Sequence, residues 1–212
     1  MSRGKGVNSR RVLVAKLILI RHGQSVWNAS NRFTGWTDVD LSDKGVLEAE
    51  QAGRDLSAQR IDVVHTSDLV RAQRTAEIIM SLNECSDGSE TRNDWRLNER
   101  NYGSLQGLNK AETAEEYGEE QVHIWRRSFD VAPPDGESLE MTAERTIPYF
   151  DEEIVPDLRD GKNVLVSAHG NSLRSIVMHI EKISPGQIVS LEIPTGVPMH
   201  YVLEDGQVKR IE

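Results

Sequence analysis

Short apolar runs rich in β-branched residues recur along the chain, each bounded by polar positions. Residues 16–20, 61–65 and 163–167 have this pattern. A continuous apolar run of four or five residues is typical of a strand that is covered on both faces. The pattern therefore predicts three buried strands that lie far apart in the sequence.

Between and after these runs, apolar residues recur every three or four positions, which predicts helices with one buried face. Such spacing occurs over residues 42–56, 69–80, 147–158 and 171–180, and Gly161 is placed to end the third helix. Strands that alternate with helices are typical of an α/β fold. We therefore expect a three-layer α/β/α architecture with a mostly parallel central sheet.

Two regions depart from the simple alternation. Apolar runs on either side of the Asp205-Gly206 turn signal predict a hairpin within residues 197–211, which adds an antiparallel edge strand. Residues 94–134 are richer in Asn, Gly, Glu and Arg, with a helix that begins at Asn109. We expect this middle region to be an insertion over one edge of the sheet.

Length and composition indicate a single domain. The 212 residues have room for one substantial core, so residues 15–212 are expected to form one catalytic domain after a mobile basic tail, residues 1–14. Lys16 interrupts the first apolar stretch, and no small-residue cleavage site follows it, which argues against a signal peptide. One cysteine, Cys85, excludes an internal disulfide and favours a reducing, cytoplasmic location.

Charge and hydropathy restrict the partners. Lys and Arg total 25 against 34 Asp and Glu, so the net charge of -9 is the wrong sign for a nucleic-acid-binding protein. No apolar run approaches the roughly 18 residues that cross a bilayer, so no membrane partner is expected. Any local cluster of arginines in so acidic a chain calls for an explanation.

The candidate chemistry lies where two of the strands end. The first strand leads into Arg21-His22-Gly23 and the third into His169-Gly170. Ligands of open α/β sheets bind beyond the carboxyl ends of the strands. Each histidine alone is as well explained as a hydrogen-bonded loop residue, but the repeated placement predicts two imidazoles that face each other across one pocket.

A neutral imidazole can attack phosphorus, and fixed positive charge then stabilises the transferring phosphoryl group. Arg21 precedes His22, and Arg71 begins the helix after the second strand, although Arg71 alone also suits a solvated helix position. Neither Cys pairs nor an H-E-x-x-H helix is present, so we expect no metal.

Longer motifs carry a family resemblance from about Lys16 to Leu203. The opening motif, residues 19–25 (LIRHGQS), resembles the signature of the histidine phosphatase superfamily. The later motifs closely resemble the cofactor-dependent phosphoglycerate mutases: residues 31–36 (NRFTGW), 97–103 (LNERNYG), 105–115 (LQGLNKAETAE), 125–127 (WRR), 168–174 (AHGNSLR) and 193–198 (IPTGVP).

The resemblance implies a role for each matching residue. His22 would be the phosphorylated nucleophile, Glu99 would donate and accept the proton of the substrate hydroxyl, and His169 would stabilise the transferring group. Arg21 and Arg71 would complete the catalytic set. The implied substrate-binding residues are Gly23, Gln24, Ser25, Asn28, Thr34, Gly35, Arg100, Asn101, Tyr102, Lys110, Arg126, Arg127, Gly170 and Asn171.

The implied activity is the glycolytic and gluconeogenic interconversion of 3-phosphoglycerate and 2-phosphoglycerate. It would pass through a phosphohistidine primed by 2,3-bisphosphoglycerate, without a metal, in a homo-oligomer that family analogy makes a dimer. Acidic neighbours would raise the pKa of Glu99, but the sequence alone does not decide it.

Two departures and two alternatives accompany this interpretation. Longer family members have an extra segment near Pro133-Pro134 and a helical tail after the last strand, whereas this sequence stops at Glu212. A missing tail would admit water, so we expect higher bisphosphoglycerate phosphatase activity than in tailed relatives. The alternatives are a phosphatase of the same superfamily, which leaves Lys110 and the Arg126-Arg127 pair without a role, and a catalytically inactive binding protein.

Overall fold

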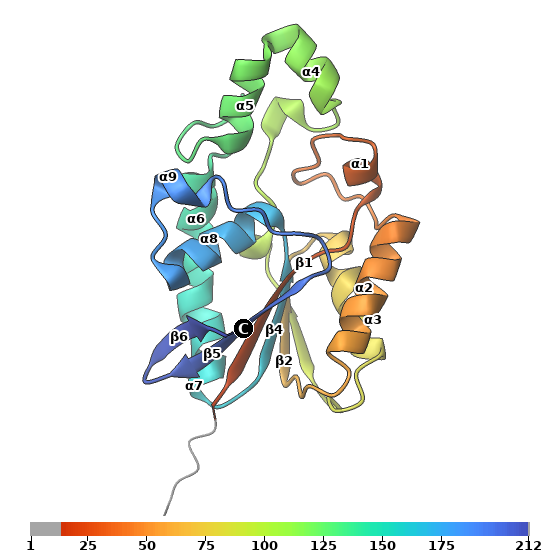
Figure 1. Cartoon of the computed structure of the whole chain (residues 1–212), viewed down its shortest axis with the longest axis vertical. Helices are drawn as coiled ribbons and strands as arrows, with labels where there is room; N and C mark the ends of the chain where they lie inside the picture. Colours follow the sequence, from red (N-terminus) through yellow and green to blue (C-terminus); the bar gives the residue numbers. More distant parts are fainter. Residues whose placement is uncertain (1–13, 212) are drawn as a thin grey trace, which may run out of the picture.

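The computed structural model describes residues 14–211, and within them six strands form one sheet in the order β3-β2-β4-β1-β5-β6 (Figure 1). β1 (Lys16–Arg21) pairs in parallel with β4 (Val164–Ala168), and β4 pairs in parallel with β2 (Val63–Thr66). The three predicted buried strands therefore lie side by side at the centre of the sheet. Of the predicted N-terminal tail, all but Val14 lies outside the described residues.

Both edges of the sheet are built differently from its centre. β5 (Pro198–Glu204) runs antiparallel to β1 and turns through Asp205-Gly206 into β6 (Gln207–Arg210), which confirms the hairpin. The opposite edge is β3 (Glu90–Asn93), parallel to β2. β3 contains only polar, largely exposed residues, so the hydrophobic pattern does not predict it.

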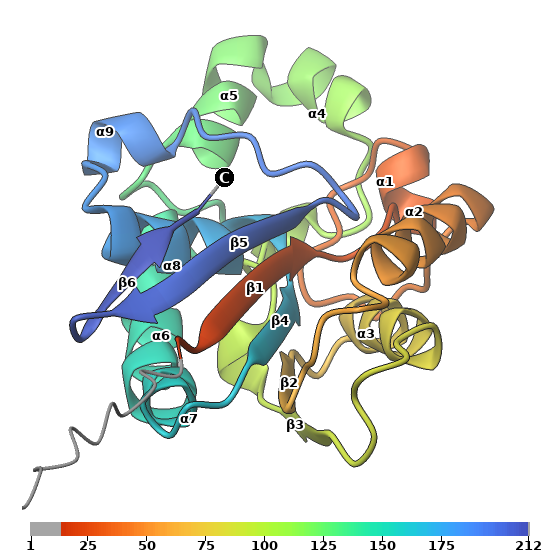
Figure 2. The ribbon, with the colours of Figure 1, turned by 60° about the horizontal axis from the view of Figure 1, so that its bottom comes forward.

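Helices cover both faces of the sheet, which confirms the three-layer architecture (Figure 2). Side chains alternate along β1, so that Leu17 and Leu19 pack into one core cluster and Ile18 and Ile20 into another. The first cluster lies against the helices α6 (Leu139–Tyr149), α7 (Val155–Arg159) and α8 (Gly170–Glu181). The second lies against α2 (Asp43–Asp55) and α3 (Val70–Ser81).

The N-terminus of α2 packs directly on the loop that follows β1. Ser42 caps this helix, and its Oγ accepts the N–H of Gly45 at 3.2 Å. A Cβ atom on Gly23 would lie 2.2 Å from the carbonyl oxygen of Gly45, and one on Gly45 would lie 2.1 Å from that of Gln24. Both positions need glycine because the two backbones touch.

The predicted long helix is continuous but contains an irregular turn. α6 passes into a π-helical turn (Phe150–Ile154) and then into α7. A π turn inserts extra backbone and shifts the helical phase. Tyr149 is consequently buried and Ile147 only half-buried, although the spacing from 147 to 158 assigns Ile147 to the apolar face.

The middle region does not lie over an edge of the sheet. α4 (Lys110–Tyr117), which Asn109 caps, and α5 (Glu119–Arg127) lie beyond the carboxyl ends of the strands (Figure 1). The reason is a small separate core, in which residues of α5 pack on the loop after β1 instead of on the sheet. This core comprises Phe33, Leu105, Val122 and Trp125.

The remaining elements are short: α1 (Val26–Ala29), α9 (Pro185–Ile188) and the 3-10 turns Trp95–Leu97 and Gly103–Leu105. In the described part of the chain, no helix combines the length and the apolar composition needed to cross a bilayer.

Candidate active site

His22 and His169 lie side by side beyond the carboxyl ends of β1 and β4. The register of these strands pairs Arg21 with Ala168, and the N–H of His22 donates to the carbonyl oxygen of Ala168 at 3.0 Å. The two imidazole centroids are consequently 4.9 Å apart, with the ring planes tilted by 59°. Two residues separated by most of the chain thus meet because their strands are adjacent and parallel.

The surroundings of His22 keep its ring neutral and leave Nε2 with a free lone pair. Nδ1 lies 2.6 Å from the carbonyl oxygen of Gly23. A carbonyl oxygen only accepts hydrogen bonds, so the ring proton is on Nδ1. Burial lowers the pKa of His22 well below its ordinary value, and the charges of Arg71 and Arg21 lower it further. Nε2 is therefore the nucleophilic atom at neutral pH.

The hydroxyl of Ser67 decides which nitrogen of His169 carries the ring proton. The Ser67 hydroxyl lies 2.7 Å from His169 Nε2, and its oxygen already accepts the N–H of Leu69 at 3.2 Å. We therefore assign the hydroxyl proton to the bond with Nε2, which places the ring proton on Nδ1. Burial, followed by the charge of Arg71, lowers the pKa of His169 well below its ordinary value.

Glu99 has one carboxylate oxygen that is held firmly by N–H groups. Oε1 accepts the N–H of Arg100 at 2.8 Å, the N–H of Asn171 at 3.1 Å and the Asn171 side-chain amide at 3.0 Å. Burial alone would raise the pKa of Glu99, but the Arg100 N–H, the charges of Arg21 and Arg71 and the Asn171 amide together lower it. The sequence leaves the direction of this shift in pKa open, and the cationic side chains nearest to Glu99 in space decide it.

Arg71, which is buried, and Arg21, which is half-buried, flank the histidines, and carbonyl groups hold their side chains. Arg21 Nη1 donates to Ile193 O at 2.9 Å; Arg71 donates from Nη2 to Gly35 O at 2.8 Å and from Nη1 to Thr37 O at 3.0 Å. Burial lowers the pKa of Arg71 to about 10, so it stays charged at neutral pH. Gly35, with φ of 55°, has the left-handed backbone that glycine tolerates.

Buried polar atoms without a hydrogen-bond partner gather at this site. Within residues 14–211, six buried side-chain nitrogen or oxygen atoms lack a partner, and all of them belong to residues around the two histidines. Such atoms are rare in folded proteins, and most of these are N–H donors, which suit an oxyanion. They are Arg21 Nε, Thr34 Oγ1, Arg71 Nε, Arg100 Nε and Nη1, and His169 Nδ1.

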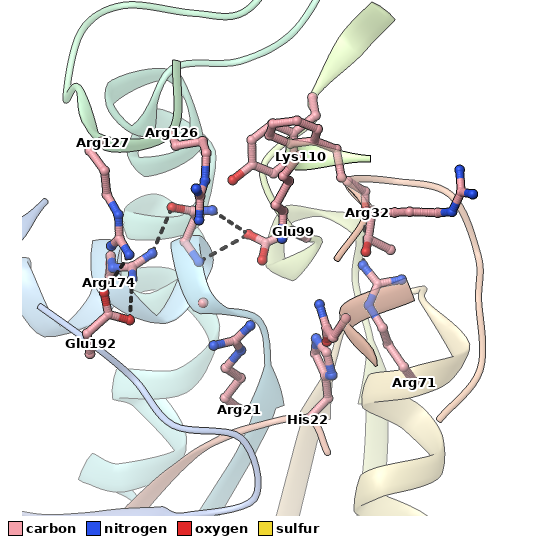
Figure 3. Close-up of a pocket in the computed structure, with 17 residues that line it drawn as sticks. Arg21, His22, Arg32, Arg71, Glu99, Lys110, Arg126, Arg127, Arg174 and Glu192 are labelled. Atoms are coloured by element: carbon pink, nitrogen blue, oxygen red, sulfur yellow. Dashed lines mark hydrogen bonds and ion pairs between the residues drawn. The ribbon is translucent and has the colours of Figure 1, made fainter. Parts of the chain in front are cut away.

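A cavity of about 180 Å³ opens from His22 toward α4 and α5 (Figure 3). Figure 3 shows Arg21, His22 and Arg71 at one end of the cavity, called the inner end, and Arg126, Arg127, Arg174 and Glu192 together at another. We call this second end the mouth because Arg126 and Glu192 are exposed there. Cationic side chains outnumber carboxylates in this lining although the chain carries a net charge of -9. The complete lining is Arg21, His22, Asn28, Arg32, Phe33, Thr34, Gly35, Arg71, Glu99, Tyr102, Lys110, Arg126, Arg127, Gly170, Asn171, Arg174 and Glu192.

Most of the site residues predicted from the sequence line this cavity, and two others lie behind it. His169 is fully buried against His22, and Arg100 is buried with its Nη2 bonded to the Tyr102 hydroxyl at 2.9 Å. The predicted residues brought to the lining are Arg21, His22, Asn28, Thr34, Gly35, Arg71, Glu99, Tyr102, Lys110, Arg126, Arg127, Gly170 and Asn171.

Four predicted residues lie outside the lining and make local contacts. The N–H of Gly23 donates to Thr75 Oγ1, and that of Gln24 donates to Glu48 Oε2. The remaining two hold loops: Ser25 caps α1, and Asn101 accepts the N–H of Gly103 through its side chain.

Sequence reasoning missed other members of the site, namely Arg32, Phe33, Arg174 and Glu192. Arg174 follows Asn171 by three residues on α8, which places both on one helix face, so helical spacing could have identified it. Glu192 carries no such signal, because an acidic residue is not expected in a cavity that suits anions. In the described residues, no group of three or more His, Cys, Asp or Glu is placed to hold a metal ion.

Comparisons with known proteins agree with this geometry. The family model for the histidine phosphatase superfamily (branch 1) matches residues 17–209. A 2,3-bisphosphoglycerate-dependent phosphoglycerate mutase of Protochlamydia amoebophila is 50% identical, over 89% of this chain and 95% of that protein. The enzyme with the same name from Parvibaculum lavamentivorans is 52% identical, over 92% of this chain and 94% of the relative.

A solved structure supports the fold. The phosphoglycerate mutase from Bacillus anthracis superposes with a TM-score of 0.79 over 93% of this chain and 92% of the other, at 23% identity. The chain belongs to the histidine phosphatase superfamily and, within it, to the family of the 2,3-bisphosphoglycerate-dependent phosphoglycerate mutases.

Proposed function

We propose that this protein interconverts 3-phosphoglycerate and 2-phosphoglycerate through a phosphohistidine at His22. The observation that carries the proposal is the set of six unpartnered buried polar atoms around two neutral imidazoles. Buried N–H groups without partners suit a ligand that has many acceptor oxygens, and a phosphoryl group is such a ligand. The names of relatives at about 50% identity support the specific substrate.

The cavity residues fit a bisphosphorylated cofactor. Arg21 and Arg71 provide positive charge beside His22, and Arg126, Arg127 and Arg174 provide it toward the mouth, so two anionic groups find separate cationic partners. When bound, 2,3-bisphosphoglycerate supplies the phosphoryl group that primes the enzyme. A cationic cluster at only one end of the cavity would leave the second phosphate of this ligand without a cationic partner.

His22 acts as the nucleophile in this proposal. Its Nε2 lone pair forms the bond to phosphorus while the bond from phosphorus to the donor oxygen breaks. The Gly23 carbonyl holds the ring proton on Nδ1 and stabilises the positive charge that the ring acquires. In the reverse direction the bond from Nε2 to phosphorus breaks as the hydroxyl oxygen of the substrate attacks.

Glu99 moves the proton of that hydroxyl. Its lowered pKa makes it an anion at neutral pH, so it accepts the proton of the attacking 2-hydroxyl and delivers a proton to the 3-oxygen when that oxygen leaves phosphorus. Oε1 is occupied by three N–H donors, and no hydrogen bond from the described residues reaches Oε2. We therefore assign the proton transfer to Oε2.

The two arginines beside His22 stabilise charge on the transferring group. Arg21 Nε and Arg71 Nε lack partners, and His169 Nδ1 carries a proton beside the His22 ring. Because carbonyl groups already hold both guanidinium groups, little reorganisation is needed during the reaction. This arrangement supplies the electrostatic part of phosphoryl transfer from the protein itself.

The experiment that tests the proposal follows both turnover and the phosphorylated residue. Purified protein is assayed for 2-phosphoglycerate formation from 3-phosphoglycerate, with and without catalytic amounts of 2,3-bisphosphoglycerate. We expect turnover to depend on the bisphosphate, and label from it to appear on His22 and to disappear in His22→Ala. Normal labelling of His22→Ala would overturn the assignment.

The phosphatase alternative has a distinct outcome in the same assay. Release of inorganic phosphate from either ligand that exceeds formation of 2-phosphoglycerate would identify a hydrolase. We do not favour it, because it leaves Lys110, Arg126 and Arg127, which all line the cavity, without a role.

Three further proposals rest on family membership and composition. The exposed thiol of Cys85 suits a reducing, cytoplasmic compartment. The assembly is proposed to be a homodimer by family analogy, which sedimentation velocity tests. Activity is proposed to need no metal, so that full turnover after dialysis against a chelator is the expected result.

A further inference from the structure

A carboxylate lies in the otherwise cationic mouth of the cavity. Glu192 belongs to the loop between α9 and β5, and its Oε1 is 2.5 Å from Arg127 Nη2 while its Oε2 is 3.8 Å from Arg174 Nη2. Figure 3 shows the carboxylate beside both guanidinium groups. Because Glu192 lines the cavity together with them, it takes a position that suits an anionic ligand group.

The two arginines do not depend on Glu192 for their positions. Arg174 Nε donates to Leu191 O at 2.7 Å, and its Nη1 donates to Asn171 Oδ1 at 3.1 Å. Arg127 Nη1 donates to Val189 O at 3.3 Å. Removal of the carboxylate therefore leaves each guanidinium tied to other groups. The role left for Glu192 is to neutralise charge at the mouth.

Exposure shows that this carboxylate can leave its place. The side chain of Glu192 is 67% exposed, whereas those of Arg127 and Arg174 are 28% and 10% exposed. An exposed carboxylate keeps most of its hydration and forms only a weak ion pair, so rotation into solvent is easy. The arginines, in contrast, stay in the cavity wall.

We propose that Glu192 is a displaceable internal anion: its carboxylate occupies Arg127 and Arg174 until the outer anionic group of a phosphoglycerate takes its place. The idea rests on the proposed function for the identity of the ligand. Glu192 then weakens the binding of every ligand with a second anionic group at the mouth, and it leaves a single phosphate at the inner end largely unaffected. It is thus a specificity-determining residue that acts through competition.

The test is Glu192→Gln, which keeps the shape of the side chain and removes the charge. We expect the Kd for 2,3-bisphosphoglycerate, measured by calorimetry, and the KM for 3-phosphoglycerate to fall by about two- to fivefold, the range of an exposed ion pair. The Kd for inorganic phosphate should change less than either. An unchanged or higher Kd for the bisphosphate would overturn the proposal, since a purely structural Glu192 would weaken binding when altered.

Glu152→Gln is the matched control. Glu152 is 66% exposed and pairs with Arg96 at 3.5 Å, away from the cavity lining, so the variant removes the same charge and a similar contact. An equal gain of affinity in both variants would show a general charge effect and contradict the proposal. Tight binding of the bisphosphate without turnover of 3-phosphoglycerate would contradict the proposed function alone, because the role of Glu192 is measured by affinity.

Discussion

The two oxygens of the Glu99 carboxylate have different surroundings, and this difference explains how one residue can handle a proton. Three N–H groups, two of them from Asn171, donate to Oε1. None of these groups donates to Oε2, and Glu99 lines the cavity. The same contacts help to lower the pKa of Glu99, so the carboxylate is charged before the substrate arrives. The same hydrogen bonds therefore fix the position of the Glu99 carboxylate and favour its charged form.

Replacing Glu99 by Gln tests this role, because the amide oxygen can still accept the three N–H groups. We expect kcat for 3-phosphoglycerate to fall by about 10²- to 10⁴-fold, since the hydroxyl proton has no acceptor. His22 should still reach full labelling by 2,3-bisphosphoglycerate, only slowly. Rapid-quench labelling and steady-state turnover measure the two effects. Glu77→Gln, on the exposed side of α3, controls for the charge change, and a Glu99→Gln variant within threefold of wild-type kcat would contradict the role.

At the scale of elements, the sequence predicts the strands and helices in which the apolar residues mark the buried positions. The apolar runs of β1, β2 and β4 and the Ser42 cap of α2 predict their elements directly. β3 carries four polar residues and exists because its backbone pairs with β2, which no side-chain pattern reports. The π turn after Tyr149 is likewise invisible, because a helical period assumes a uniform helix.

One helix holds the loop that carries Glu99. Arg145, on α6, donates from Nη1 to Arg96 O at 2.9 Å and Asn98 O at 3.0 Å, and from Nη2 to Glu99 O at 3.0 Å. Trp36 Nε1 donates to the same Glu99 oxygen at 2.6 Å. The ammonium group of a lysine cannot donate to several carbonyl oxygens in one plane, as the guanidinium group of an arginine does. Arg145 is therefore a positioning residue for the Glu99 backbone.

Arg145→Lys keeps the charge beside Glu137 and removes the planar fork. We expect kcat to fall by about tenfold or more, as small misplacements of catalytic groups reduce rates strongly, with KM changed less than threefold. Labelling of His22 should still go to completion. Arg96→Lys, whose guanidinium bonds Asp94 and not the Glu99 loop carbonyls, is the control. If kcat per folded molecule stays at the wild-type value while thermal stability drops, Arg145 is structural only.

For the whole molecule, the sheet order decides what the sequence can and cannot reveal about the site. The two His-Gly pairs are visible because each directly follows an apolar run, and adjacent parallel strands then bring them together. The environment of Glu99 is not visible, because its neighbours in space, Arg21 and Arg71, come from distant segments. Glu192 was missed for the same reason: only the folded loop brings it to Arg127.

Bringing the catalytic groups into the interior also makes the stability of the whole molecule depend on pH. His22, His65 and His169 are all buried. Burial lowers the pKa of each one, and for His65 it outweighs the opposing contact with Asp157. The unfolded chain, whose histidines titrate near pH 6.5, therefore binds more protons than the folded protein below that pH.

The sign of the effect follows from proton linkage. Above about pH 6.5 the histidines are neutral in both states and their full contribution to stability is present. As the pH falls from there toward the lowered folded pKa values, each buried histidine reduces the free energy of unfolding by about 1.4 kcal/mol per pH unit. Urea unfolding at pH 7.0, 6.0 and 5.5 should show this decline in the free energy of unfolding. In His22→Asn the decline should be shallower by the contribution of one histidine. Asparagine can still donate to the Gly23 carbonyl. Identical slopes for the two proteins would mean that His22 titrates alike in the folded and the unfolded state, which would contradict the lowered pKa of the buried ring.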